Sequence, residues 1–160
     1  MLPLTMAGIW IVLAVLPRIS PKGYRLESFQ SIYGLIQLAL MTALLVTSIV
    51  ALLAATNRHV TINTITPIVI GLLFIILGNY MGKLRKNFFI GIRTPWTLAS
   101  DEVWVRIHRL GSWLFVAGGL AIVITGVLAP SAYMPIIMIG IIAVSALVHR
   151  LPLRMSFTDA

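Results

Sequence analysis

Residues 78–111, with the sequence GNYMGKLRKNFFIGIRTPWTLASDEVWVRIHRLG, form a polar segment between two long apolar stretches. This polar segment holds half of the 12 basic residues and two of the four acidic residues of the 160-residue chain. The chain as a whole is strongly apolar: 59% of its residues are hydrophobic, 10% are charged, and the mean hydropathy is +1.02. Because soluble domains carry about 25% charged residues, this composition indicates an integral membrane protein.

Uncharged stretches on both sides of the polar segment predict the membrane spans. There are four of them: Leu2–Pro17, Ser28–Asn57, Val60–Gly82 and Leu110–Val148. A spanning helix needs about 20 apolar residues, so the second and third stretches predict one span each. The fourth is long enough for two, because Ala129-Pro130-Ser131 divides it into Ser112–Leu128 and Tyr133–Val148. Leu2–Leu16 predicts a short first span of about 22 Å. We therefore expect an all-α polytopic membrane helix bundle with five transmembrane helices.

The basic residues predict the orientation of these helices. Alternate loops hold eleven basic residues against a single one, Arg58, which is the positive-inside pattern. This pattern predicts a cell-membrane protein with its N-terminus outside and its C-terminus in the cytoplasm. It also accounts for the net charge of +8 without nucleic-acid binding, and makes the lipid bilayer the first partner.

Four regions follow from the predicted spans. Residues 1–27 form the first transmembrane helix and a basic cytoplasmic loop, and residues 28–82 form helices two and three. Residues 83–111 form a cytoplasmic loop with a short amphipathic helix, and residues 112–160 form a transmembrane hairpin and a cytoplasmic tail.

Common catalytic and metal-binding motifs are absent from the sequence. The chain has no cysteine, and it contains no Gly-rich phosphate loop, HExxH pattern or GxSxG elbow. The three histidines, His59, His108 and His149, lie at different predicted membrane boundaries. They therefore suggest no metal cluster. We therefore expect no enzymatic activity, no metal and no cofactor.

Several features predict local structure at the start of the polar segment. Gly78 and Gly82 have a small-xxx-small spacing that lets another helix approach closely. The amide of Asn79 needs hydrogen-bonding partners, either from another span or from the polar segment folding back; an Asn wetted at the interface is the alternative. Gly91 permits a bend, and Pro95 predicts a defined turn over residues 93–96, in which Arg93 either binds an anion or caps a helix.

Ser100 predicts the N-cap of a helix, with Asp101 and Glu102 favoured in its first turn. The pattern that follows predicts an amphipathic helix over Ser100–Leu110 that lies along the membrane plane and runs into the next span. His108 on this helix is either a proton carrier or a hydrogen-bonded interfacial residue. The large aromatic side chains Phe88, Phe89, Trp96 and Trp104 predict that the polar segment folds against the bundle, because a free loop would expose them to water.

These residues together resemble the signature of the Sdp immunity protein (SdpI) family of membrane proteins. The matching elements are Gly78-Asn79-Tyr80, Asn87, the run from Gly91 to Leu98, Trp104, His108-Arg109 and Gly111. With Leu16–Ile19 and Pro21, the resemblance covers roughly residues 1–128. Longer members carry a further N-terminal membrane segment, so we expect the chain to be a shorter variant or a fragment.

The resemblance implies a function. The founding member of the family protects a producer cell from a secreted toxic peptide, and holds a transcriptional repressor at the membrane when it engages that peptide. The resemblance and the local features together give these candidate functional residues: Asn79, Asn87, Gly91, Arg93, Thr94, Pro95, Trp96, Thr97, Asp101, Trp104, His108 and Arg109.

Two other functions remain open from the residues alone. A small transporter or membrane enzyme would use Asn79, Arg93, Asp101 and His108 at the cytoplasmic face. The small size also allows a structural accessory subunit, and a homo-oligomer is compatible with the sequence. Against the transporter, no ionisable residue lies in the middle of a predicted span, where ion paths usually need one.

Overall fold

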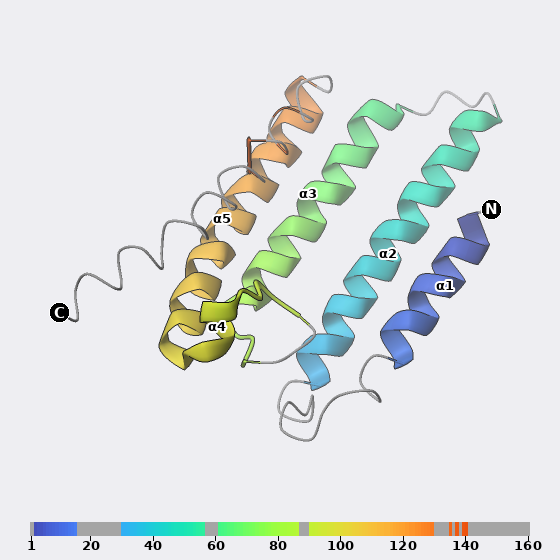
Figure 1. The fold of residues 1–160 in the computed structure, drawn as a ribbon. Helices are drawn as coiled ribbons and strands as arrows, with labels where there is room; N and C mark the ends of the chain where they lie inside the picture. The colour runs from blue at the N-terminus through green and yellow to red at the C-terminus, as the bar shows by residue number, and fades with distance from the viewer. Residues whose placement is uncertain are drawn as a thin grey trace.

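The computed structural model describes residues 2–15, 30–56, 61–86 and 90–129, together with single positions at 135, 137, 139 and 140. Over these residues the structure is all-helical and contains no strand, which confirms the predicted fold class at this level. The helices are α1 (Leu2–Val15), α2 (Gln30–Ala55), α3 (Ile62–Met81), α4 (Pro95–Ala99) and α5 (Asp101–Leu128). Figure 1 shows α1, α2, α3 and α5 side by side in chain order, with the short α4 beside the start of α5.

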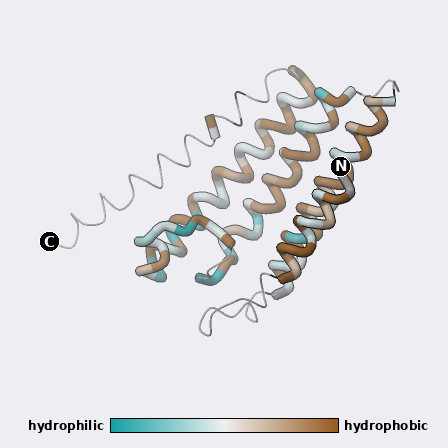
Figure 2. Tube along the Cα trace, turned by 45° about the vertical axis from the view of Figure 1, so that its right-hand side comes forward, coloured by the Kyte–Doolittle hydropathy of each residue, from teal (hydrophilic) through white to brown (hydrophobic). Residues whose placement is uncertain are grey.

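Three of these helices are long and apolar enough to cross a membrane: Ser31–Ala55 in α2, Ile62–Met81 in α3, and Asp101–Leu128 in α5. The first predicted span corresponds to α1, which has 14 residues and is shorter than the other three. The predicted fifth span, Tyr133–Val148, and the Pro130 turn before it lie outside the continuously described ranges. Figure 2 shows that apolar residues follow the long helices, whereas hydrophilic residues gather at the end of the bundle that carries α4.

Glycines allow α3 and α5 to pack closely along their length. A Cβ atom built on Gly71 would lie 2.6 Å from the carbonyl oxygen of Gly119, and one built on Gly119 would lie 2.6 Å from the carbonyl oxygen of Gly71. Nearer the α4 end, Gly78 faces Phe115 in the same way, and a Cβ atom on Gly78 would lie 2.9 Å from that side chain. The predicted close approach at Gly78 is therefore confirmed, and the partner helix is α5.

The contacts of α2 with α1 and α3 are less close than those between α3 and α5. The Tyr33 hydroxyl on α2 donates a hydrogen bond to the carbonyl of Leu13 in the last turn of α1. Tyr33 also belongs to a small buried cluster with Met81 and Leu84, at the point where the end of α3 meets the start of α2. Through Leu84, this cluster packs the chain that follows α3 against the start of α2.

The amphipathic helix predicted over Ser100–Leu110 is not a separate element. Residues 101–128 form one continuous helix, so the predicted interfacial helix is the first part of α5. Gly111, which directly follows the predicted Ser100–Leu110 segment, is buried inside α5, where an added Cβ atom would lie 2.9 Å from Met81 and 3.1 Å from Ile92. This glycine makes room for neighbouring side chains and does not interrupt the helix.

Candidate functional site

The chain between α3 and α5 turns at Gly91, whose φ angle is +116°. L-residues with a side chain rarely adopt this conformation, so the predicted bend at Gly91 is confirmed. The turn allows the backbone N–H of Ile92 to donate a 3.0 Å hydrogen bond to Nε2 of His108. A Cβ atom on Gly91 would lie 2.2 Å from the same nitrogen, so the loop approaches His108 as closely as a glycine allows.

His108 is 1% exposed and both of its ring nitrogens are engaged by backbone groups. Nε2 accepts from Ile92, and we therefore assign the proton to Nδ1, which lies 2.9 Å from the carbonyl oxygen of Trp104 and donates to it. The imidazole is thus neutral and has no nitrogen left for a substrate or an ion. Of the two roles considered for His108, the geometry favours the hydrogen-bonded anchor over the proton carrier.

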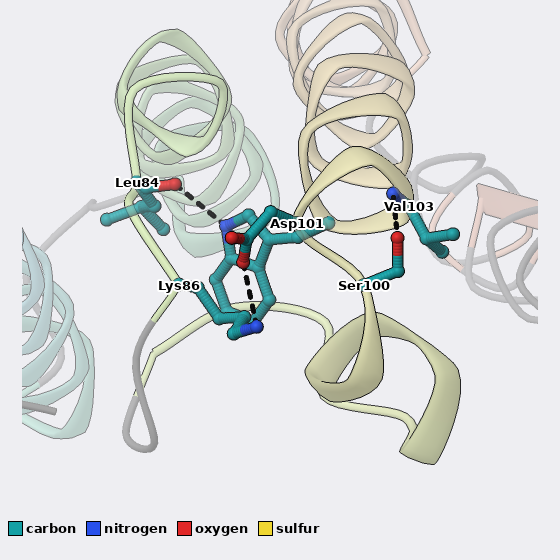
Figure 3. Close-up of polar contacts among 6 residues, drawn as sticks. Leu84, Lys86, Ser100, Asp101 and Val103 are labelled. Atoms are coloured by element: carbon teal, nitrogen blue, oxygen red, sulfur yellow. Dashed lines mark hydrogen bonds and ion pairs between the residues drawn. The ribbon is translucent and has the colours of Figure 1, made fainter. Parts of the chain in front are cut away.

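Trp104 continues this arrangement towards α3. Its ring stacks on the His108 ring with centroids 4.0 Å apart and 20° between the planes, and its side chain is 1% exposed. Its Nε1–H donates a 2.8 Å hydrogen bond to the carbonyl oxygen of Leu84, just beyond the end of α3 (Figure 3). Leu84 lies outside any helix, so its carbonyl has no helical partner, and Trp104 supplies the donor.

Thr97 also belongs to the site, and its side chain is fully buried. Thr94 and Thr97 form a reciprocal capping box that starts α4, with Pro95 at the first helical position. The Thr97 hydroxyl accepts from the Thr94 N–H at 2.8 Å and also lies 3.0 Å from the Ile92 carbonyl. The turn predicted over residues 93–96 is therefore the beginning of a one-turn helix. We refer to Leu84, Gly91, Ile92, Thr94, Thr97, Trp104 and His108 together as the loop–helix cluster.

Charged residues surround the loop–helix cluster on its exposed side. Lys86 Nζ lies 2.7 Å from Asp101 Oδ1 and joins the end of α3 to the start of α5 (Figure 3). Glu102 and Arg106 form an i,i+4 ion pair at 2.5 Å. The Ser100 hydroxyl accepts from the Val103 N–H at 3.4 Å, which confirms the predicted N-cap of the helix. Because these ion pairs are largely exposed, they add little stability, and the buried hydrogen bonds hold the site.

The remaining candidate residues lie at the edge of the cluster or away from it. Asn79, Arg93 and Arg109 are exposed, whereas Trp96 is half-buried. The indole N–H of Trp96 is itself buried and has no acceptor among the residues that the structure describes. Asn87, with Phe88 and Phe89, lies outside the described residues.

The prediction that the polar segment folds against the bundle is confirmed for residues 90–99. Ile92 bonds to His108, Thr97 is buried, and α4 contacts α5. The hypothesis of a transporter or an enzyme used a site formed by Asn79, Arg93, Asp101 and His108. Of these, His108 and Asp101 already have partners within the chain. His108 has both ring nitrogens occupied, and Asp101 is paired with Lys86. Within the described ranges, no three His, Asp or Glu side chains are placed to hold a metal ion.

The sequence did not reveal several residues that position the site. Leu84 supplies a carbonyl acceptor, a role that any residue could play and that leaves no sequence signal. Ser112 donates a 2.6 Å hydrogen bond to the carbonyl of Gly78 and so ties α5 to α3. Gly111, Gly119 and Gly126 recur every seven or eight residues, and this spacing could have indicated the face of α5 that meets α3.

Replacing Trp104 with phenylalanine should lower the free energy of unfolding by about 1–3 kcal/mol, because the buried Leu84 carbonyl loses its donor. The matched control is Trp113→Phe, since Trp113 lies on the same helix and is 72% exposed. Thermal unfolding of both variants in the same detergent, followed by circular dichroism, measures the difference. Equal stability of the two variants would show that the Trp104 hydrogen bond is not important for the fold.

Comparisons with known proteins give two similarities. Residues 83–156 match the model of the SdpI/YfhL protein family, and this region contains the whole loop–helix cluster and α5. The chain is also 32% identical over 100 residues to "Immunity protein SdpI" of Bacillus subtilis (strain 168). That alignment covers 62% of this chain and 48% of the relative, so the chain spans about half the length of the curated relative it matches. No solved structure matches the chain.

Proposed function

We propose that the chain is a non-enzymatic membrane immunity protein of the SdpI/YfhL family, whose model matches residues 83–156. In this role it protects the cell that makes it against a membrane-active toxic peptide. The observation that carries the proposal is the 32% identity to a relative named as an immunity protein. The three apolar helices of spanning length support its place in a membrane.

The loop–helix cluster supports a binding role for this end of the bundle. Its buried hydrogen bonds fix the backbone from Gly91 to Thr97, so side chains at the rim are held in place. Arg93 is exposed there, and the buried N–H of Trp96 has no acceptor in the described part of the chain. A partner that offers a carbonyl or carboxylate oxygen would satisfy the Trp96 donor, and the Arg93 guanidinium is suited to the same chemistry.

We also propose that the charged face of α5 docks a cytoplasmic transcriptional repressor. Asp101, Glu102 and Arg106 are exposed on the first turns of α5, beside the loop–helix cluster. Peptide binding that displaces the loop would move this face, because the buried hydrogen bond from Ile92 to His108 joins the loop to α5. The transporter or enzyme is the weaker candidate, since His108 offers no free ring nitrogen.

Protection is expected to depend on Arg93 and Trp96. Expression of the chain should raise the concentration of a membrane-active toxic peptide that sensitive cells survive. Arg93→Lys keeps the charge and loses the planar guanidinium, and Trp96→Ala removes the half-buried indole. Each variant should accumulate in the membrane normally and lose most of its protection. Trp113→Ala, at an exposed position on α5 with no assigned role, is the matched control for the tryptophan. Full protection by the Arg93→Lys, Trp96→Ala double variant would contradict this assignment.

The orientation of the helices is a separate prediction. We expect the polar segment and the C-terminus in the cytoplasm and the N-terminus outside, because eleven basic residues lie in alternate loops and one, Arg58, lies in the others. Reporter fusions after Arg58 and after Lys86 should report opposite sides of the membrane. Fusions that both report one compartment would refute the predicted number of spans between them.

A further inference from the structure

An apolar groove with a volume of about 510 Å³ lies between α2 and α3, on helices that Figure 1 shows side by side. Its α2 wall runs from Leu35 to Val46, and its α3 wall runs from Val69 to Tyr80. At the α3–α5 contact, by contrast, glycines bring the two backbones together. The two helices that form the groove are both long enough to span a membrane.

The length of the groove matches one leaflet of a bilayer. Val69 and Tyr80 are eleven residues apart on α3, which at 1.5 Å per residue is roughly 17 Å. The hydrocarbon core of a bilayer is about 30 Å thick, so one leaflet is about 15 Å deep. In a bilayer spanned by α3, which ends one residue after Tyr80, the groove would extend from the membrane boundary to near the middle of the bilayer.

A positive charge lies at the boundary end of the groove. Tyr80 is part of the groove wall, and Lys83 Nζ lies 5.2 Å from the centroid of the Tyr80 ring. Lys83 is exposed and follows the last turn of α3. An apolar channel one leaflet deep, with an ammonium group at its mouth, has the chemistry that an anionic phospholipid requires.

We propose that the α2–α3 groove binds one anionic phospholipid, with an acyl chain along the groove and the phosphate at Lys83. A peptide helix or a helix from a second copy fits less well. An eleven-residue helix about 11 Å in diameter occupies roughly 1,600 Å³, more than the groove can enclose. An acyl chain is a single file of carbon atoms and can enter without separating α2 from α3.

The test uses the full chain, purified in detergent and mixed with equal amounts of phosphatidylglycerol and phosphatidylcholine of identical acyl chains. Native mass spectrometry then counts the lipid molecules that each protein retains. The wild-type chain should retain one lipid, with phosphatidylglycerol preferred. Lys83→Gln should reduce this preference about fivefold, the effect expected of one basic side chain at a lipid surface. Arg106→Gln, which removes one charge from an exposed position on α5, should leave the preference unchanged.

Filling the groove tests the acyl-chain position. Ala43→Phe places a ring in the α2 wall and should abolish retention of both lipids. Ala51→Phe makes the same change at an exposed position on α2 outside the groove, and should have no effect. Leu72→Phe, from the α3 wall, repeats the test if Ala43→Phe does not fold.

Three results would overturn the proposal. The first is equal retention of the two lipids by the wild-type chain. The second is undiminished retention by both groove-filling variants, which would place the lipid elsewhere. The third is a wild-type dimer that Ala43→Phe converts to a monomer, because a second copy would then cover the groove.

Discussion

Gly119→Ala is expected to destabilise the bundle by about 3 kcal/mol, the upper end of the usual cost of overpacking a core. The new methyl group would lie 2.6 Å from the carbonyl oxygen of Gly71 and 2.9 Å from the backbone nitrogen of Ile75. Both are backbone atoms, so no side-chain rotation relieves the clash and α3 and α5 must move apart. The separation would also weaken the hydrogen bond between Ser112 and the Gly78 carbonyl.

Gly118→Ala is the matched control for this prediction. Gly118 is the adjacent residue of the same helix, and nothing lies within 4 Å of the position that its Cβ would take. Its replacement should leave stability unchanged or raise it by up to about 1 kcal/mol, since alanine favours a helix over glycine. Thermal unfolding in detergent compares the two variants directly. Equal stability of Gly119→Ala and Gly118→Ala would mean that the α3–α5 backbones are not in contact.

Gly91→Ala is expected to release the loop from α5 without unfolding the bundle. The alanine would have to hold a φ of +116° and place its Cβ 2.2 Å from His108 Nε2. The chain can relieve both only by moving away, which breaks the bond between Ile92 and His108. Each buried polar group left without a partner costs about 1–3 kcal/mol, so the closed loop should no longer be the dominant state.

Amide hydrogen exchange over residues 90–99 measures this release. Exchange there should be fast in Gly91→Ala, while α3 and α5 keep their protection. Gly82→Ala is the control, because Gly82 has a φ of −67° and a Cβ added to it would make only an ordinary 3.7 Å contact with Ser112. If the cluster supports immunity as proposed, protection from the toxic peptide should fall in Gly91→Ala only. Unchanged exchange over residues 90–99 would contradict the role assigned to the Gly91 turn.

Features that depend on local chemistry were predictable from the sequence. Uncharged stretches predicted α2, α3 and the membrane-spanning part of α5, because the bilayer imposes a length and a composition. The N-cap at Ser100 and the bend at Gly91 follow from the residues themselves. The resemblance to the SdpI family agrees with the match of residues 83–156 to the SdpI/YfhL family model.

Features that depend on tertiary contacts were not predictable in the same way. The sequence left His108 with two roles, and only the position of the Ile92 N–H decides between them. The acceptor for Trp104 is a backbone carbonyl, which carries no signal in the residue type. The space that Gly111 provides is used by Met81 and Ile92, which are distant in the sequence or on another element.

The continuity of α5 has a mechanical consequence for a protein that acts at a membrane. Its 28 residues extend about 42 Å, which is longer than the hydrocarbon thickness of about 30 Å. One end of this rod lies in the hydrogen-bonded loop, and the remainder is in register with α3 through Gly71 and Gly119. A displacement of α5 at one membrane surface would therefore move the whole helix, including its end at the other surface, because no hinge absorbs the motion. In such a molecule, a stimulus on one side of the bilayer can be reported on the other without a pore.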